Sequence, residues 1–113
     1  MSNFYNKTII IGRLGEDPKL KPHSKAEFQT EFYISNCTIR DGEEVVQWHK
    51  IAAFGKQAKL CADYLHKGDL CCIEGRLDID TRTEPYKQYI VAERITFLSA
   101  SKKKETKEVC HEL

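Results

Sequence analysis

The period of the hydrophobic pattern changes once along this chain, and that change restricts the fold more than any other feature. Apolar and polar residues alternate along five short runs, as in strands with one face in a core. The runs are KTIIIGRL (7–14), FQTEFYISNCTI (28–39), VVQWHKIAAF (45–54), DLCCIEGRLDI (69–79) and QYIVAERITFL (88–98). Over residues 56–68 the apolar residues recur at helical spacing instead, and Gly68 is placed to end that helix. The expected order is therefore three strands, one helix and two strands.

Glycines and one turn signal complete the prediction of the fold. Gly12 and Gly75 interrupt two of the runs, where a bulge or a sharp bend is expected. The dipeptide Asp41-Gly42 between two alternating runs predicts a hairpin. We predict an all-β fold, a five-stranded Greek-key OB-fold barrel with one helix between strands 3 and 4. A β-grasp or SH3-like barrel fits the number of strands, but explains the position of the helix less well.

Size and charge allow one small domain with no dominant charge. The chain has 113 residues and a formal net charge of +1, so a basic surface can arise only from the placement of charges. We expect the barrel to span residues 1–100 and a short basic and polar tail, 101–113, to be flexible. No apolar run approaches the ~20 residues that cross a bilayer, and the N-terminus lacks the features of a secretory signal. An odd number of cysteines, five, without a CxxC pair argues against a disulfide framework or zinc site, and favours small buried side chains.

The segment QWHKIAAFGK, residues 47–56, has an unusual division between its two faces. Trp48, Lys50, Phe54 and Lys56 fall on one side of a strand, and His49 falls on the other. Aromatic rings can stack on unpaired bases while lysines between them meet phosphates. The alternative is that the two rings pack under a neighbouring loop or subunit.

Patterns typical of catalysis are missing from the sequence. It contains no nucleophile elbow, P-loop or HExxH motif. Asp78 and Asp80 point to one side of a strand, but two carboxylates alone are a weak signal for a divalent ion. We therefore expect a protein that is not an enzyme and has no metal or cofactor.

Three separated motifs give the chain a family resemblance. NKTIIIGRLGEDP (6–18), WHKIAAFGK (48–56) and YLHKGDLCCIEGRL (64–77) resemble the bacterial and mitochondrial single-stranded DNA-binding proteins, and ITFLS (95–99) resembles the mitochondrial members. The resemblance covers residues 5–100 in order. It implies an OB-fold barrel that assembles as a homotetramer, with a dimer as the alternative. The implied function is to bind and protect single-stranded DNA, whatever its sequence, during DNA replication, recombination and repair.

The resemblance also assigns roles to individual residues. Stacking positions fall on Trp48 and Phe54, and a position at subunit contacts falls on His49. The cations implied as phosphate contacts are Lys7, Arg13, Lys50, Lys56, Arg40 and Arg82.

Departures from the family pattern predict weaker binding or a shorter footprint. Ile39 stands where many members have a second tryptophan, and Arg82 stands where many have a third aromatic residue, with Tyr86 nearby. Asp78 and Asp80 occupy positions that are basic in many relatives, and their charge would repel phosphate. These departures keep an alternative open: an OB-fold accessory or interaction module that loads or regulates replication proteins and binds DNA weakly.

The C-terminal segment leaves further partners open. Bacterial members end in an acidic peptide that recruits replication and repair proteins, and EVCHEL is only a faint echo of it. Recruitment is therefore expected to be absent, unless the tail has been removed. The run Lys102–Lys104 is expected to be a solvated tail, with contact to nucleic acid as the alternative. We expect a cytoplasmic, nucleoid-associated protein, with the mitochondrial matrix as the alternative, and no membrane partner.

Overall fold

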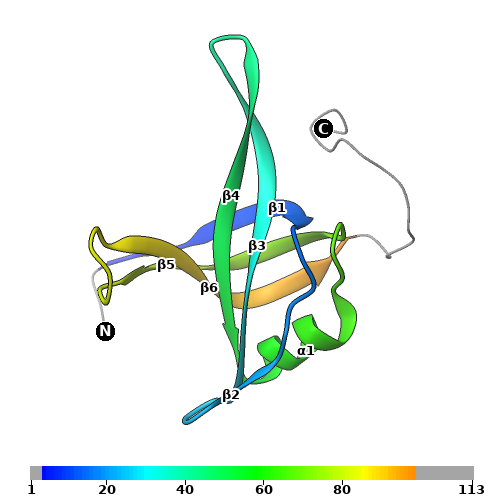
Figure 1. The fold of residues 1–113 in the computed structure, drawn as a ribbon, viewed down its shortest axis with the longest axis vertical. Helices are drawn as coiled ribbons and strands as arrows, with labels where there is room; N and C mark the ends of the chain where they lie inside the picture. Colours follow the sequence, from blue (N-terminus) through cyan, green and yellow to red (C-terminus); the bar gives the residue numbers. More distant parts are fainter. Residues whose placement is uncertain (1–3, 99–113) are drawn as a thin grey trace.

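The computed structural model describes residues 4–98, which form six strands and one helix (Figure 1). The predicted strands and helix are all present, but the helix ends at Tyr64, followed by an extended Leu65, and not at Gly68. In chain order the elements are β1 (Thr8–Leu14), β2 (Lys21–His23), β3 (Glu27–Arg40), β4 (Glu43–Phe54), α1 (Lys56–Tyr64), β5 (Leu70–Asp80) and β6 (Lys87–Phe97). The predicted tail, 101–113, with its lysine run, lies outside the described residues.

Strand β2 is the element that the sequence did not predict. It has only three residues and pairs with the edge of β3, with Pro22 opposite Phe28. Proline has no N–H to donate and is confined to sheet edges, so its presence argued for a loop here. The Nδ1 atom of His23 accepts the backbone N–H groups of Lys25 and Ala26 at 3.1 and 2.9 Å, which fixes the turn into β3.

Five of the strands close into the predicted Greek-key barrel. The sheet order is β1-β5-β6-β4-β3-β2, and β1 also pairs with β3, which closes the ring. The β4–β6 pairing is parallel and the others are antiparallel. Gly12 permits closure because a methyl group there would collide with the carbonyl of Ser35. At Gly75 the β5–β6 register shifts, as a bulge, and an added methyl would collide with the carbonyl of Val91.

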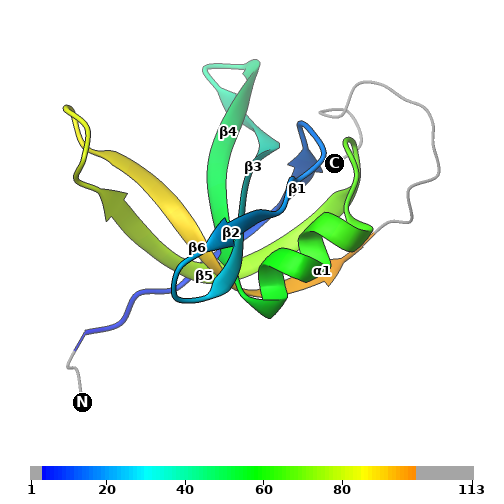
Figure 2. The same ribbon diagram turned by 60° about the horizontal axis from the view of Figure 1, so that its bottom comes forward.

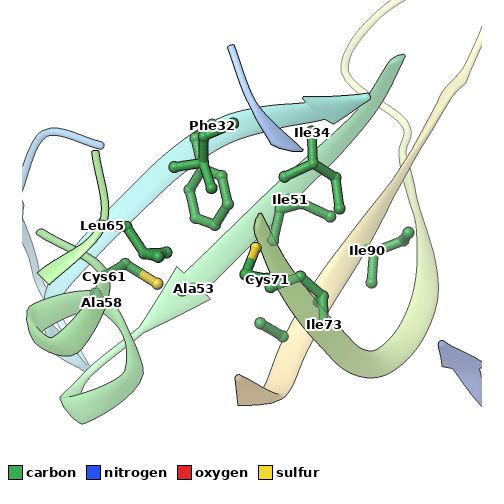
Figure 3. Close-up of a cluster of buried hydrophobic side chains, with 12 residues drawn as sticks. Phe32, Ile34, Ile51, Ala53, Ala58, Cys61, Leu65, Cys71, Ile73 and Ile90 are labelled. Atoms are coloured by element: carbon green, nitrogen blue, oxygen red, sulfur yellow. The ribbon is translucent and has the colours of Figure 1, made fainter. Parts of the chain in front are cut away.

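The core fills the barrel and is sealed by α1 at one end (Figure 3). Strands β3 and β4 contribute Phe32, Ile34 and Ile51, all fully buried, and the helix adds Ala58 and Cys61. The helix contacts β3, β4 and β6, so it holds together the ends of three barrel strands.

Two of the described cysteines fit the expectation of small buried side chains. Cys61 and Cys71 are buried free thiols, and burial raises the pKa of each to about 12, so both stay protonated. Cys37 and Cys72 are only half-buried. Among residues 4–98, no helix has the length and apolar character needed to span a membrane.

Two long hairpins leave the barrel in different directions (Figures 1 and 2). In the β3–β4 hairpin, Arg40 pairs with Glu43 across the predicted two-residue turn. Asp41 and Gly42 have φ values of 54° and 81°, as hairpin turns with two left-handed residues require. This turn sets which residue of β3 lies opposite each residue of β4, and so determines which side chains share the outer surface of the hairpin.

Candidate nucleic-acid interface

The outer surface of β3 and β4 carries the residues of the WHKIAAFGK motif. Residues directly opposite each other on antiparallel strands share a face. Ile51 and Ala53 are buried in the core, so the alternate positions of β4 point outward. We call the following outward residues the β3–β4 face: Glu31, Tyr33, Ser35, Trp48, Lys50 and Phe54. Lys50 shares this surface with aromatic rings because the surface lies outside the barrel.

Trp48 is the most open aromatic residue of the β3–β4 face, with 55% of its surface exposed. Its ring lies over Gly15, where an added Cβ would come within 2.7 Å of the ring atom Cζ3. The backbone N–H of Gly15 donates to the carbonyl of Tyr33 at 3.0 Å, which ties the segment after β1 to β3. The indole therefore packs against the backbone of Gly15 on one side and is exposed on the other.

Phe54 is half-buried at the end of β4. Its ring meets that of His23 on β2 edge to face, with centroids 5.3 Å apart and planes at 68°. The sequence left open whether this ring stacks on bases or packs under a neighbouring segment. The ring packs on His23 and is still partly accessible, so the structure leaves room for both roles.

Tyr33 is an aromatic residue of the face that the sequence analysis did not select. It lies opposite Lys50 and diagonal to Trp48, and 45% of its surface is exposed. Diagonal neighbours on a sheet are within reach of aromatic side chains. The signal was available, because the Asp41-Gly42 turn fixes the pairing and Tyr33 alternates with the buried Phe32.

The predicted cations are distributed over several parts of the molecule. Lys50 lies on the β3–β4 face, and Arg13 lies beside it on β1, opposite Ser35. Arg13 also donates from Nη1 to the carbonyl of Gly68 at 3.0 Å. The other predicted cations lie outside this face: Lys7 before β1, Arg40 at the tip of β3–β4, Lys56 at the start of α1 and Arg82 in the β5–β6 turn.

Three of these cations form ion pairs within the chain. Lys7 lies 3.7 Å from Glu74, and Lys50 lies 3.6 Å from Glu31. In the β5–β6 turn, Arg82 donates from Nε to Oδ1 of Asp80 at 2.9 Å and from Nη2 to Oδ2 at 3.0 Å. The charge of Asp80, expected to repel phosphate, is thus paired with Arg82.

The pKa shifts follow these contacts. The side-chain hydrogen bond from Arg82 holds the pKa of Asp80 well below its usual range, and the charge of Lys50 contributes. Burial is the largest cause that raises the pKa of Tyr89, and the nearby carboxylate of Asp78 adds to it. Asp78 itself accepts the backbone N–H of Ile79 at 2.8 Å. Within the described residues, no group of three or more His, Cys, Asp or Glu side chains is arranged to hold a metal ion.

His49 lies on the inward side of the β3–β4 hairpin, opposite Ile34. It is half-buried, and its Nε2 lies 3.2 Å from Oδ1 of Asn36. Burial lowers the pKa of His49, which favours the neutral form of the imidazole. Its predicted role at a subunit contact stays a prediction.

Comparison with known proteins agrees with this architecture. Residues 5–98 match the single-strand binding protein family. A single-stranded DNA-binding protein of Xylella fastidiosa is 33% identical over 108 residues, which cover 87% of this chain and 66% of that protein. A single-stranded DNA-binding protein 2 of Clostridium acetobutylicum is 34% identical over 105 residues, covering 86% of this chain and 79% of that one.

A solved structure shares the fold. It is described as the Plasmodium falciparum SSB complex with single-stranded DNA, and it superposes with a TM-score of 0.75 at 24% identity, covering 88% of this chain and 99% of that one. The chain spans about two thirds of the length of the first bacterial relatives, 66% for Xylella fastidiosa and 68% for Chlorobaculum tepidum. By the match over residues 5–98, this chain belongs to the single-strand binding protein family.

Proposed function

We propose that this chain binds single-stranded DNA whatever its sequence and protects it during replication, recombination and repair. The observation that carries the proposal is the open β3–β4 face, where Trp48, two residues before Lys50 on β4, and Tyr33, opposite Lys50 on β3, both expose their rings. In OB-folds, the surface of the second and third barrel strands is the one that binds oligonucleotides, and here those strands are β3 and β4.

The physical basis is stacking combined with charge neutralisation. Every base has a π-face, so stacking on Trp48, Tyr33 and the accessible part of Phe54 does not depend on sequence. Lys50 and Arg13 are placed to meet phosphates along the same surface, and Lys56 follows Phe54 closely in the chain. The mechanism is binding without chemical turnover.

Quenching of tryptophan fluorescence tests this function directly. Trp48 is the single tryptophan of the chain, so its emission reports on the β3–β4 face alone. We expect oligo-dT to quench this emission, a duplex of equal length to do so much less, and rising salt to weaken binding. Trp48→Ala should weaken binding by about 1–3 kcal/mol, the range known for stacking platforms of single-strand-binding proteins in general.

A matched control separates stacking from general loss of an aromatic residue. Tyr64 on α1 is also exposed but lies outside the β3–β4 face, so Tyr64→Ala should leave the affinity unchanged. Equal losses in the two variants, or no loss in Trp48→Ala, would contradict the proposed role of the face.

The second candidate is an OB-fold accessory module that loads or regulates replication proteins and binds DNA weakly. The ion pairs of Lys7, Lys50 and Arg82 favour it, because they reduce the charge available to phosphates. A gel shift with long oligo-dT at low and moderate salt separates the candidates. A shift that persists at moderate salt favours the first, and a shift confined to low salt favours the second.

We further propose that the chain self-associates as a homotetramer, with a dimer as the alternative, and acts in the cytoplasm at the nucleoid. Ile9 and Ile11 on β1 support association, because 59% and 50% of their surfaces are exposed in the isolated chain. Light scattering with and without oligo-dT measures the assembly, and a monomer under both conditions would contradict it. A bulkier side chain disrupts a packed subunit contact, so His49→Tyr should lower the mass, and an unchanged mass would contradict a role of His49 at the contact.

A further inference from the structure

The outer face of the barrel continues from β4 across β6 to β5. Ala52 on β4 pairs with Val91 on β6, and Val91 pairs with Arg76 on β5. Because successive residues of a strand alternate between faces, Asp78 and Asp80 share the outer side of β5 with Arg76. The β5–β6 hairpin therefore adds carboxylates on the same outer side of the barrel as Lys50, with the buried Ala52 and Val91 between them.

The Asp80–Arg82 contact has the geometry of an arginine bound to an anionic ligand. The guanidinium meets both carboxylate oxygens at 2.9 and 3.0 Å, and the backbone N–H of Arg82 donates to Oδ1 at 3.0 Å. This two-pronged fit is the one that Arg also makes with phosphate. The Arg82 side chain is 82% exposed, whereas that of Asp80 is 15% exposed, so the cation lies over the acid and faces solvent.

A second pair lies nearby on β3 and β4. Nζ of Lys50 lies 3.6 Å from Glu31, and both side chains belong to the β3–β4 face. The two pairs also act on one another electrostatically: Lys50 helps to lower the pKa of Asp80, and Glu31 helps to raise that of Arg82. The surface thus presents two cations and two carboxylates, and each cation is already paired with a carboxylate: Lys50 with Glu31 and Arg82 with Asp80.

We infer that Asp80 and Glu31 compete with the phosphates of single-stranded DNA for Arg82 and Lys50, and so set how tightly the chain binds. This inference rests on the proposed function. When a phosphate displaces a carboxylate, the cation stays neutralised and the displaced acid is left beside the DNA. Binding then gains less from counterion release than the number of lysines and arginines would indicate.

Neutral variants of the two acids test this competition. Asp80→Asn and Glu31→Gln should each tighten binding to a labelled oligo-dT roughly twofold to fivefold at low salt, by freeing one exposed cation. Each should also steepen the slope of log affinity against log salt by about 0.7, the value for one additional phosphate contact on a single strand. The control is Asp63→Asn, which breaks the 3.9 Å pair with Lys59 on α1 and changes the net charge equally.

A double-mutant cycle separates competition from simple repulsion. If Asp80 acts by occupying Arg82, most of the gain from Asp80→Asn should disappear in an Arg82→Gln background. A gain that persists in full in that background overturns the inference. So does an Asp80→Asn or Glu31→Gln affinity no higher than that of Asp63→Asn. Failure of the wild-type chain to bind oligo-dT at all would instead refute the proposed function, and this inference with it.

Discussion

Because the Trp48 ring packs on Gly15, a substitution at Gly15 can displace the ring while Trp48 itself stays unchanged. In Gly15→Ala the new Cβ would lie 2.7 Å from Cζ3 and 3.1 Å from Cη2 of the indole. Carbon atoms in contact prefer about 3.5–4.0 Å, so the ring must move by roughly 1 Å. Gly15 does not have a positive φ, and the atoms it meets are the far end of a side chain. The backbone therefore stays in place while the indole swings away.

We expect this change to separate affinity from stability. A compatible Gly→Ala substitution stabilises by about 0.4–1 kcal/mol, which offsets the lost contact with the ring. The free energy of unfolding, measured by urea titration, should therefore stay within about 1 kcal/mol of the wild-type value. Affinity for oligo-dT, measured by anisotropy, should fall roughly fivefold, because a displaced ring loses part of the ~1–3 kcal/mol of one stacked base.

A double-mutant cycle with Trp48→Ala identifies the cause. Gly15→Ala should have no effect on affinity once Trp48 is absent, because the two residues act through one contact. It should also shift the emission of Trp48, the single tryptophan. An unchanged affinity and emission in Gly15→Ala, or the same loss of affinity in the Trp48→Ala background, would refute the reasoning.

Three other variants test separate features. Tyr33→Ala should weaken oligo-dT binding in anisotropy titrations while Tyr33→Phe keeps most of it, because the exposed ring does the stacking; equal losses would contradict this. Burial lowers the pKa of His49, so the unfolded chain takes up this proton first and stability falls as the pH drops below about 6.5. His49→Gln should therefore flatten the pH dependence of urea unfolding between about pH 7 and 5.5, and an unchanged slope would argue against it. Gly75→Ala should destabilise by at least about 1–3 kcal/mol in urea, because its methyl group collides with the backbone of Val91, and an unaltered midpoint would disprove the tight bulge.

The position of the missing second tryptophan, Ile39, and the exposed Tyr33 lie on the same hairpin. Ile39 lies exposed near the tip of β3, so the surface there is still apolar but lacks a flat ring. Tyr33 supplies an exposed ring nearer the centre of the same hairpin. The predicted deficit in aromatic platforms is therefore smaller than the sequence indicated, and the prediction of weaker binding now rests mainly on the paired cations.

Much of the site could be predicted because its information is local. The alternation of β4 places Trp48 and Phe54 together, and the Asp41-Gly42 turn sets their partners on β3. Tyr33 was missed only because the register set by the Asp41-Gly42 turn was not counted back from Lys50 on β4 to its partner on β3. Strand β2 was missed because three residues containing a proline have no periodicity of their own.

By itself, the sequence determined the order of strands and helix, the side of the strand that Trp48 shares with Lys50 and Phe54, and the turn that pairs β3 with β4. These follow from backbone periodicity and from residues that tolerate a positive φ, which act within a few positions of the chain. Only the tertiary structure decided that the indole lies on Gly15, that Phe54 meets His23, and that Lys7 meets Glu74. Those contacts join distant segments. The Trp48–Gly15 and Lys7–Glu74 contacts form only when β1 pairs with β3 and β5 to close the barrel, and the Phe54–His23 contact forms when β2 pairs with β3 beside β4.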